Sequence, residues 1–225
     1  MDLKEAMEQR HTVRSYIDRP LPSEVIRLLA ERIQKNNEAY RLHMQLITEN
    51  IEAFGPLLRL ILAKGVRNYI ILSAPAGPTV EERLGYCGAD VMLYAQTLGL
   101  NSWWVGGTFN KKGVQKNADS AGTEKIIGLI AIGYGATQGV PHKSKRPEDI
   151  SHYHGKAPDW FIEGVRAVLL APTALNRQAF QIEGDGERVS MSYGRGAFAD
   201  VDLGIGKYHF EIGAEREHFI WAEHS

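Results

Sequence analysis

The chain contains two stretches with the same order of an apolar helical stripe and an alternating strand pattern. Pro22–Leu46 superimposes on Pro158–Ile182 without a gap. The matched apolar pairs of the helix are Val25 with Phe161, Ile26 with Ile162, Leu29 with Val165 and Ile33 with Leu169. The strand pairs are Met44 with Phe180, Gln45 with Gln181 and Leu46 with Ile182. Such self-similarity predicts two related halves, and coincident patterning of two amphipathic units is the alternative.

A second superposition pairs Gly88 with Gly204, Trp103 with Phe219 and Trp104 with Ile220, again a helix followed by a strand. Helices alternate with strands along the chain, but some strands arrive as hairpins. We therefore expect an α+β fold of central, mostly antiparallel sheets flanked by helices. The expected halves are residues 1–145 and a shorter 146–225, which together form one compact unit.

Composition narrows the classes of function. The chain has 225 residues, 44% of them hydrophobic, and a formal net charge of -1. It is long enough for a sizeable core, and its charge favours neither nucleic acid nor an anionic membrane as partner. The apolar runs are strand-length, the N-terminus is charged, and Cys87 is the only cysteine. We expect a cytoplasmic protein without a disulfide, and without a metal site because His152 and His154 lack a third ligand.

Arg10, Thr12 and Arg14 form a candidate anion site in a stretch that reads as extended chain. Residues two apart in extended chain share a face, so two guanidinium groups would flank one hydroxyl. Guanidinium makes paired, charge-assisted hydrogen bonds to phosphate oxygens. The same spacing is common on solvated surfaces, which is the alternative.

Three further segments carry candidate ligand contacts. Lys143 and Lys145 belong to a basic segment stiffened by prolines, which is either a second side of a phosphate clamp or a solvated loop. Gly106-Gly107 ends a strand and lets backbone N–H groups approach a ligand. Ala171–Gln178 joins a helix to a strand, where the amides of Asn176 and Gln178 suit a heterocycle's edge, unless the segment is an ordinary connection.

These motifs together resemble those of the nitroreductase-like FMN flavoproteins. Arg10-His11-Thr12-Val13-Arg14 resembles the family's opening Arg-x-Ser-x-Arg/Lys, and Ala171–Gln178 resembles its Ala-Pro-Ser-x-x-Asn-x-Gln loop. Gly88–Gly107 is similar to its central helix, strand and glycine segment, and Lys143-Ser144-Lys145 to its last basic segment. The resemblance implies FMN as cofactor. The implied cofactor-binding residues are Arg10, His11, Thr12, Arg14, Gly106, Gly107, Lys143, Lys145, Pro172, Thr173, Ala174, Asn176 and Gln178.

The position of the Pro-x-x-x-Asn loop departs from the usual family pattern. In the family that loop follows the arginines by a few tens of residues and serves the partner subunit's FMN. Here the corresponding stretch, Lys35–Tyr40, does not match, and the loop lies in the second half. The repeat places Arg146, Glu148 and Ile150 under Arg10, Thr12 and Arg14, and an acid and an isoleucine cannot hold a phosphate. We therefore expect a divergent subgroup with both halves in one chain, one FMN per chain, and a monomer that can form a complete site, while a homodimer remains open.

The resemblance implies an NAD(P)H-dependent FMN nitroreductase. NAD(P)H would reduce the flavin, and a small electron-poor acceptor, a nitroaromatic or a quinone, would then reoxidise it in a ping-pong cycle. Arg14 would stabilise the negative charge of the reduced flavin. No side-chain acid or base is required, so the sequence names no catalytic residue. The alternatives are a flavin-binding or sensory protein without turnover, and a structural protein whose basic residues are only surface charges.

Overall fold

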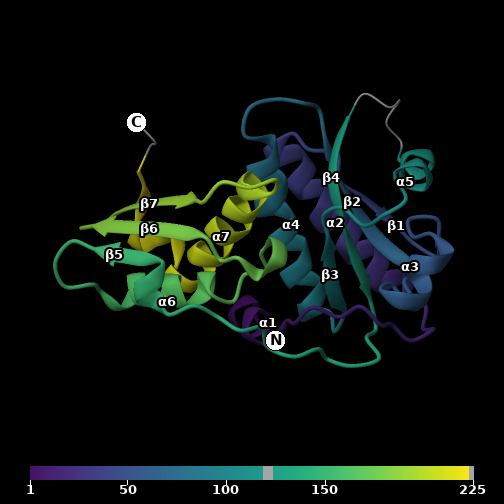
Figure 1. Ribbon diagram of the computed structural model, residues 1–225, viewed down its shortest axis with the longest axis horizontal. Helices are drawn as coiled ribbons and strands as arrows, with labels where there is room; N and C mark the ends of the chain where they lie inside the picture. Colours follow the sequence, from purple (N-terminus) through teal and green to yellow (C-terminus); the bar gives the residue numbers. More distant parts are fainter. Residues whose placement is uncertain (119–123, 223–225) are drawn as a thin grey trace.

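The computed structural model describes residues 1–118 and 124–222 and contains two four-stranded sheets with helices around them (Figure 1). The helices are α1 (Leu3–Gln9), α2 (Ser23–Tyr40), α3 (Pro56–Ile61), α4 (Val80–Thr97), α5 (Lys111–Asn117), α6 (Asp159–Val168) and α7 (Ala199–Ala214). The strands are β1 (Gln45–Ile47), β2 (Asn68–Ala74), β3 (Asn101–Val105), β4 (Lys125–Gly133), β5 (Ser151–Tyr153), β6 (Phe180–Asp185), β7 (Arg188–Tyr193) and β8 (Ile220–Trp221). The expected α+β architecture is confirmed.

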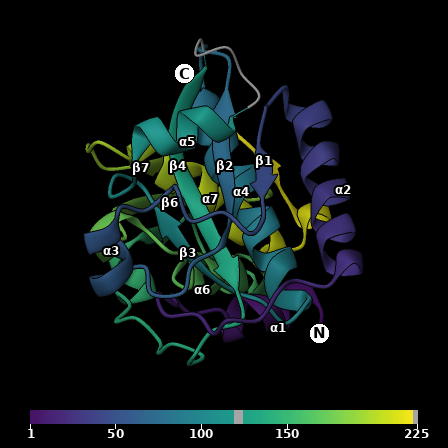
Figure 2. The same ribbon diagram turned by 90° about the vertical axis from the view of Figure 1, so that its right-hand side faces the viewer.

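The first sheet has the order β1-β2-β4-β3, and all of its neighbouring strands are antiparallel. Every residue of β2 is buried, as the apolar run at its centre predicts for a strand covered on both faces. In Figure 2, α3 and α5 lie in front of this sheet and α4 lies behind it. Sequence analysis did not predict α5, whose seven residues include three lysines and a glycine.

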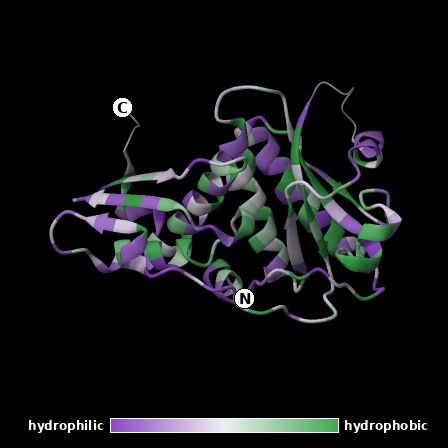
Figure 3. Cartoon of the chain, viewed as in Figure 1, coloured by the Kyte–Doolittle hydropathy of each residue, from purple (hydrophilic) through white to green (hydrophobic). Residues whose placement is uncertain are grey.

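The second sheet has the order β5-β6-β7-β8 and is half-buried. Its centre is the expected hairpin, in which β6 and β7 pair antiparallel around Gly186 at a φ of 54°. Burial alternates strictly along β6, and Figure 3 shows the matching alternation of hydropathy. The two outer strands pair in parallel with their neighbours. The sequence did not predict β5, because its three residues, with the exposed His152 at the centre, are too few to carry a strand pattern.

Helices α4 and α7 connect the two sheets, and they pack against each other at the centre of the molecule (Figure 1). Glycines set their separation. A Cβ on Gly85 would lie 2.2 Å from the Val201 carbonyl oxygen, and one on Gly204 would lie 1.9 Å from the Glu82 carbonyl oxygen. Only residues without a side chain permit this approach of two backbones.

Both superposed units fold alike: α2 precedes β1 as α6 precedes β6, and α4 precedes β3 as α7 precedes β8. The sheets are nevertheless not equivalent. In the first, β4 lies between β2 and β3, whereas β7 pairs directly with β8 in the second. The expected division at residue 145 therefore stays a prediction. Within the described residues, the structure contains no helix long and apolar enough to span a membrane.

Candidate functional site

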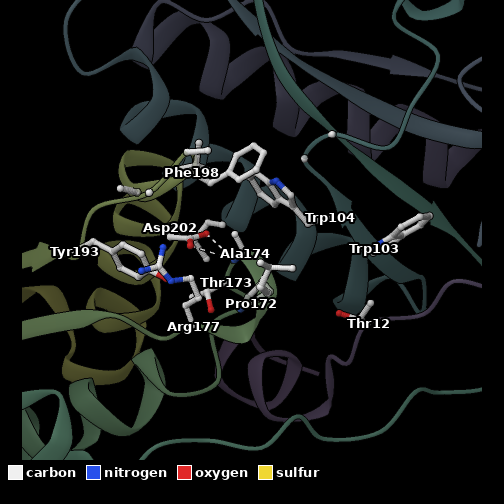
Figure 4. A pocket seen from close by; sticks show the side chains of 18 of the residues that line it. Thr12, Trp103, Trp104, Pro172, Thr173, Ala174, Arg177, Tyr193, Phe198 and Asp202 are labelled. Carbon is white, nitrogen blue, oxygen red and sulfur yellow. Dashed lines mark hydrogen bonds between the residues drawn. The ribbon is translucent and has the colours of Figure 1, made fainter.

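A cavity of about 430 Å³ opens between the first sheet and the second half of the chain (Figure 4). Three separate stretches contribute its walls: the N-terminal extended segment with the end of β3, the loop after α6, and the start of α7 with the end of β7. The lining residues that carry the argument are Thr12, Arg14, Trp103, Trp104, Gly106, Gly107, Pro172, Thr173, Ala174, Arg177, Tyr193, Phe198 and Asp202.

The N-terminal segment reaches the cavity because it runs alongside β3. Val13 donates its backbone N–H to the Ser102 carbonyl at 3.0 Å, and Thr12 forms an isolated parallel β-bridge with Ser102. Thr12 and Arg14 then flank the buried Val13 and both line the cavity, as the extended spacing predicts. The Arg14 guanidinium lies 5.4 Å from the centre of the Trp103 ring, a cation–π contact that fixes its direction.

Gly106 and Gly107 follow β3 directly and line the cavity. A Cβ on Gly106 would lie 2.8 Å from the Phe198 ring, so the glycine allows the two halves to meet at this point. Gly107 has open space where a Cβ would be, which leaves its backbone accessible to a ligand.

The loop after α6 forms the opposite wall in a strained conformation. Leu175, Asn176 and Gln178 have φ values of 55°, 54° and 45°, in the left-handed region that costs residues other than glycine free energy. Side chains hold the loop in place. Both Asp202 carboxylate oxygens accept the Ala174 N–H at 3.1 Å, and the Thr173 hydroxyl accepts the Gln178 N–H at 3.1 Å. Pro172, Thr173 and Ala174 therefore face the cavity on a fixed backbone (Figure 4).

Four of the sequence-predicted residues meet one another beside the cavity rather than on its wall. The Asn176 and Gln178 amides both donate to the Lys143 carbonyl, at 2.8 and 2.9 Å. The Lys145 ammonium donates to the Gln178 carbonyl at 2.9 Å, and the Lys145 N–H donates to the Gln178 amide oxygen at 2.9 Å. These contacts join the basic segment to the strained loop. The amides that sequence analysis assigned to a heterocycle's edge are engaged within the protein in this arrangement.

Arg10 and His11 lie behind Thr12 and outside the cavity lining. Arg10 is 3% exposed, and burial lowers the pKa of its guanidinium to about 10. Its Nε makes no hydrogen bond within the described residues. Burial, the Arg10 charge and the nearby His142 lower the pKa of His11. A buried cation with an unpartnered donor is costly unless an anion completes its surroundings.

Sequence analysis missed several residues that line the cavity. Trp103, Trp104 and Asp202 line the cavity although none of them is among the sequence-predicted site residues. Tyr193, Phe198 and Arg177 carried no signal, because their shared location depends on how β7, α7 and the loop after α6 pack. The alternation along β3 was a usable signal for the tryptophans, since Trp103 stacks on Phe54 with ring centres 5.9 Å apart while Trp104 faces α4 at Gly88.

Sequence comparison identifies the family. Residues 2–214 match the family described as "Putative TM nitroreductase". The chain belongs to this family. The matched range includes both the Arg10–Arg14 segment and the Pro172–Asn176 loop. No curated protein matches the chain.

Solved structures of nitroreductases share the fold. A "putative nitroreductase" from Thermotoga maritima superimposes with a TM-score of 0.67 at 22% identity, over 96% of this chain and 85% of that one. A "Putative NADH dehydrogenase/NAD(P)H nitroreductase" from Bacteroides thetaiotaomicron gives 0.54 at 18% identity, over 68% of this chain and 98% of that one. One from Desulfovibrio desulfuricans, solved in complex with FMN, gives 0.51 at 17% identity, over 67% and 95%. The nitroreductase-like fold inferred from the sequence is confirmed.

The coverage of these matches differs in an informative way. About two thirds of this nitroreductase-family chain accounts for nearly the whole of the Bacteroides and Desulfovibrio proteins. The superposition with the Thermotoga protein instead covers 96% of this chain and 85% of that one. This chain is therefore longer than the unit that the Bacteroides and Desulfovibrio proteins represent, and its division into two halves stays a prediction.

Proposed function

We propose that the cavity holds one FMN and that the protein is an NAD(P)H-dependent FMN oxidoreductase acting on nitroaromatic or quinone acceptors. The observation that carries the proposal is the composition of the cavity: Thr12 and Arg14 on one wall and Pro172–Ala174 on the other, both from one chain. The site also fits an anionic cofactor. The Arg10 Nε is buried without a partner, and a phosphate group near it would supply the missing acceptor.

Each part of the chain would have a distinct role toward FMN. Arg10, His11, Thr12 and Lys143 would hold the phosphate end: Arg10 and Lys143 would supply positive charge, Thr12 a hydroxyl, and His11, whose pKa is lowered, a neutral imidazole. Lys143 is exposed, and its ammonium makes no ion pair among the described residues, so it is free to turn toward the phosphate. Lys145, Asn176 and Gln178 would act indirectly, by holding Pro172, Thr173 and Ala174 against the cofactor.

When bound, FMN supplies hydride transfer, and the protein's contribution is binding, orientation and electrostatics. The Arg14 guanidinium, held on the Trp103 face, would supply a positive charge to stabilise the negative charge of the reduced cofactor. The backbone N–H groups of Gly106 and Gly107 would donate to the cofactor's ring edge. Trp104 and Phe198 would exclude water from the part of the cavity that the cofactor leaves open. The nicotinamide and the acceptor would bind there in turn.

Absorbance and anaerobic titration test the proposal. The purified protein should show flavin absorption bands, NADH or NADPH should bleach them without oxygen, and a quinone should restore them. Absence of bound flavin after incubation with FMN would overturn the cofactor assignment. A bound flavin that dithionite reduces but neither nicotinamide reduces would instead favour a flavin-binding protein without turnover.

A further inference from the structure

The wall formed by the second half places a carboxyl and a phenol side by side. Asp202 is the one carboxyl among the residues that line the cavity, and it is 4% exposed. Tyr193 projects from the end of β7 toward the same point, as Figure 4 shows. Its buried hydroxyl makes no hydrogen bond within the described residues. A donor and an acid therefore face a cavity whose remaining lining is largely apolar.

The contacts of Asp202 leave the carboxyl available for proton chemistry. Asp202 accepts the Ala174 N–H and faces the Tyr193 hydroxyl, whereas the Arg177 guanidinium donates to the Arg195 carbonyl at 3.0 Å instead of to the carboxylate. Accepting the Ala174 N–H does not by itself require an acid at this position, because a neutral amide oxygen accepts the same hydrogen bond. The Tyr193 hydroxyl beside it is buried without a hydrogen-bond partner among the described residues, which is rare in folded proteins, and a ligand oxygen would satisfy it.

We propose that Asp202 is a catalytic residue that gives a proton to an oxygen of the electron acceptor, while the Tyr193 hydroxyl donates a hydrogen bond to that acceptor. The inference rests on the proposed function and names a group that the sequence analysis left out. Reduction of a quinone to a hydroquinone needs one hydride and one proton. The hydride comes from the reduced flavin, the Asp202 O–H bond breaks as the acceptor's O–H bond forms, and solvent reprotonates the carboxylate through the partly exposed Thr173 side.

Electrostatics supports this assignment. Burial raises the pKa of Asp202 to about 6, against smaller opposing effects of the Tyr193 hydroxyl, the Ala174 N–H and the Arg177 charge. Burial and the neighbouring Asp202 raise the pKa of Tyr193 to about 12, so the phenol keeps its proton. Across the cavity stands Arg14, and on the α4 side Glu82 is paired with Lys207 at 2.5 Å. A proton donor is most effective when its pKa lies near the working pH.

Stopped-flow reoxidation isolates the proton step. Wild type and Asp202→Asn, both loaded with FMN and reduced by dithionite, are mixed with 1,4-naphthoquinone or with ferricyanide, which accepts electrons without a proton. General acids contribute roughly 10²–10⁴-fold, so the variant should reoxidise with naphthoquinone at least tenfold more slowly at pH 6 and without the wild type's fall above that pH. Its rate with ferricyanide should be unchanged. Asp200→Asn, an exposed neighbour on α7, is the matched control.

Thermal unfolding of the apoprotein gives a readout that does not involve turnover. The folded carboxyl keeps its proton to a higher pH than the unfolded one, so the wild-type Tm should fall relative to Asp202→Asn between about pH 4 and pH 6. Parallel Tm curves would show that Asp202 titrates normally. Tyr193→Phe, which keeps the ring, should slow the naphthoquinone reaction alone, and it tests the site even if Asp202→Asn folds poorly.

The outcomes separate this inference from the proposed function. Dithionite-reduced protein that reoxidises equally fast with and without the Asp202 carboxyl overturns the proton role and leaves the FMN assignment intact. Equal slowing with naphthoquinone and ferricyanide also overturns it, because a distorted cavity would explain both. Failure of NADH and NADPH to reduce the flavin overturns only the proposed activity, and a protein that binds no FMN overturns both.

Discussion

Arg10 shows at residue scale how a short motif becomes a buried site. The Arg-x-Thr-x-Arg spacing predicts guanidinium groups on one face, and the structure places Arg14 at the cavity but Arg10 beneath the surface, where its Nε has no partner. Arg10 is buried because it ends α1 and because α1 packs on α4. The capping box of α1, at Asp2 and Glu5, is encoded within the segment itself, whereas the contact with α4 depends on residues far along the chain.

Arg10→Ala and Arg14→Ala should each weaken FMN binding. A charge-assisted contact contributes about 1.5–3 kcal/mol, which corresponds to roughly a ten- to hundredfold rise in Kd measured by flavin fluorescence. Lys143→Ala should have a smaller effect, because an exposed lysine is a flexible point charge. Arg166→Ala is the control, since that arginine pairs with Glu163 on the surface of α6. Unchanged affinity in all three site variants would remove the phosphate from this location.

At residue scale, sequence patterns could place the polar and small residues of the first wall, and the family resemblance pointed to Pro172, Thr173 and Ala174 of the second wall but not to its remaining residues. Thr12, Arg14, Gly106 and Gly107 were predictable because local extended chain and a strand end fix where they point. Tyr193, Phe198 and Asp202 lie on the cavity only because β7 and α7 fold back over the loop after α6. No local periodicity encodes that long-range contact.

The loop after α6 is the element whose conformation departs most from local preference. Leu175 has a φ of 55° and is 95% exposed, so its side chain contributes almost no packing in return for its backbone strain. Hydrogen bonds that the loop donates to Asp202, Thr173 and Lys143, and one that it accepts from Lys145, hold it instead.

Leu175→Gly should therefore stabilise the protein. Relief of about 1–2 kcal/mol of left-handed strain exceeds the roughly 0.4–1 kcal/mol that glycine's freedom in the unfolded chain costs. The free energy of unfolding in urea should rise by up to about 1 kcal/mol. The control is Leu60→Gly in α3, 77% exposed on helical backbone, which should lose about 1 kcal/mol. Equal losses for the two variants would mean that Leu175 carries no strain.

The contact between α4 and α7 holds the two halves together at element scale. Gly204→Ala would bring a methyl group to 1.9 Å from the Glu82 carbonyl oxygen, and such overpacking costs typically about 1–3 kcal/mol. We expect lower stability in urea and weaker FMN binding together, because the second wall of the cavity begins on α7. Gly77→Ala, with open space around the added methyl, should change neither. Full stability of Gly204→Ala would argue against close packing of these helices.

For the whole molecule, the superposed helix–strand units could be predicted from the sequence, while the pairing of strands within the two sheets could not. The inserted β4 and the parallel outer strands β5 and β8 depend on pairing partners far along the chain. The units also explain the asymmetry of the site. α2 continues unbroken to Tyr40, whereas α6 ends at Val168 and leaves the chain free to form the Pro172–Ala174 wall.

The residues at the mirrored position support a single site. Arg146, which superimposes on Arg10, is exposed and pairs with Asp149 at 2.7 Å, and Ile150, which superimposes on Arg14, is buried. Neither offers a free guanidinium group to a second phosphate. The account therefore expects one FMN per chain, with both walls of its site supplied by the same polypeptide.

Light scattering with flavin absorbance on the same chromatographic peak tests this claim most directly. The account predicts that a dilute sample with the mass of one chain, 25.1 kDa, retains about one FMN. An obligate dimer that loses its flavin when it dissociates would contradict it, because the Pro172–Ala174 wall would then come from the partner subunit.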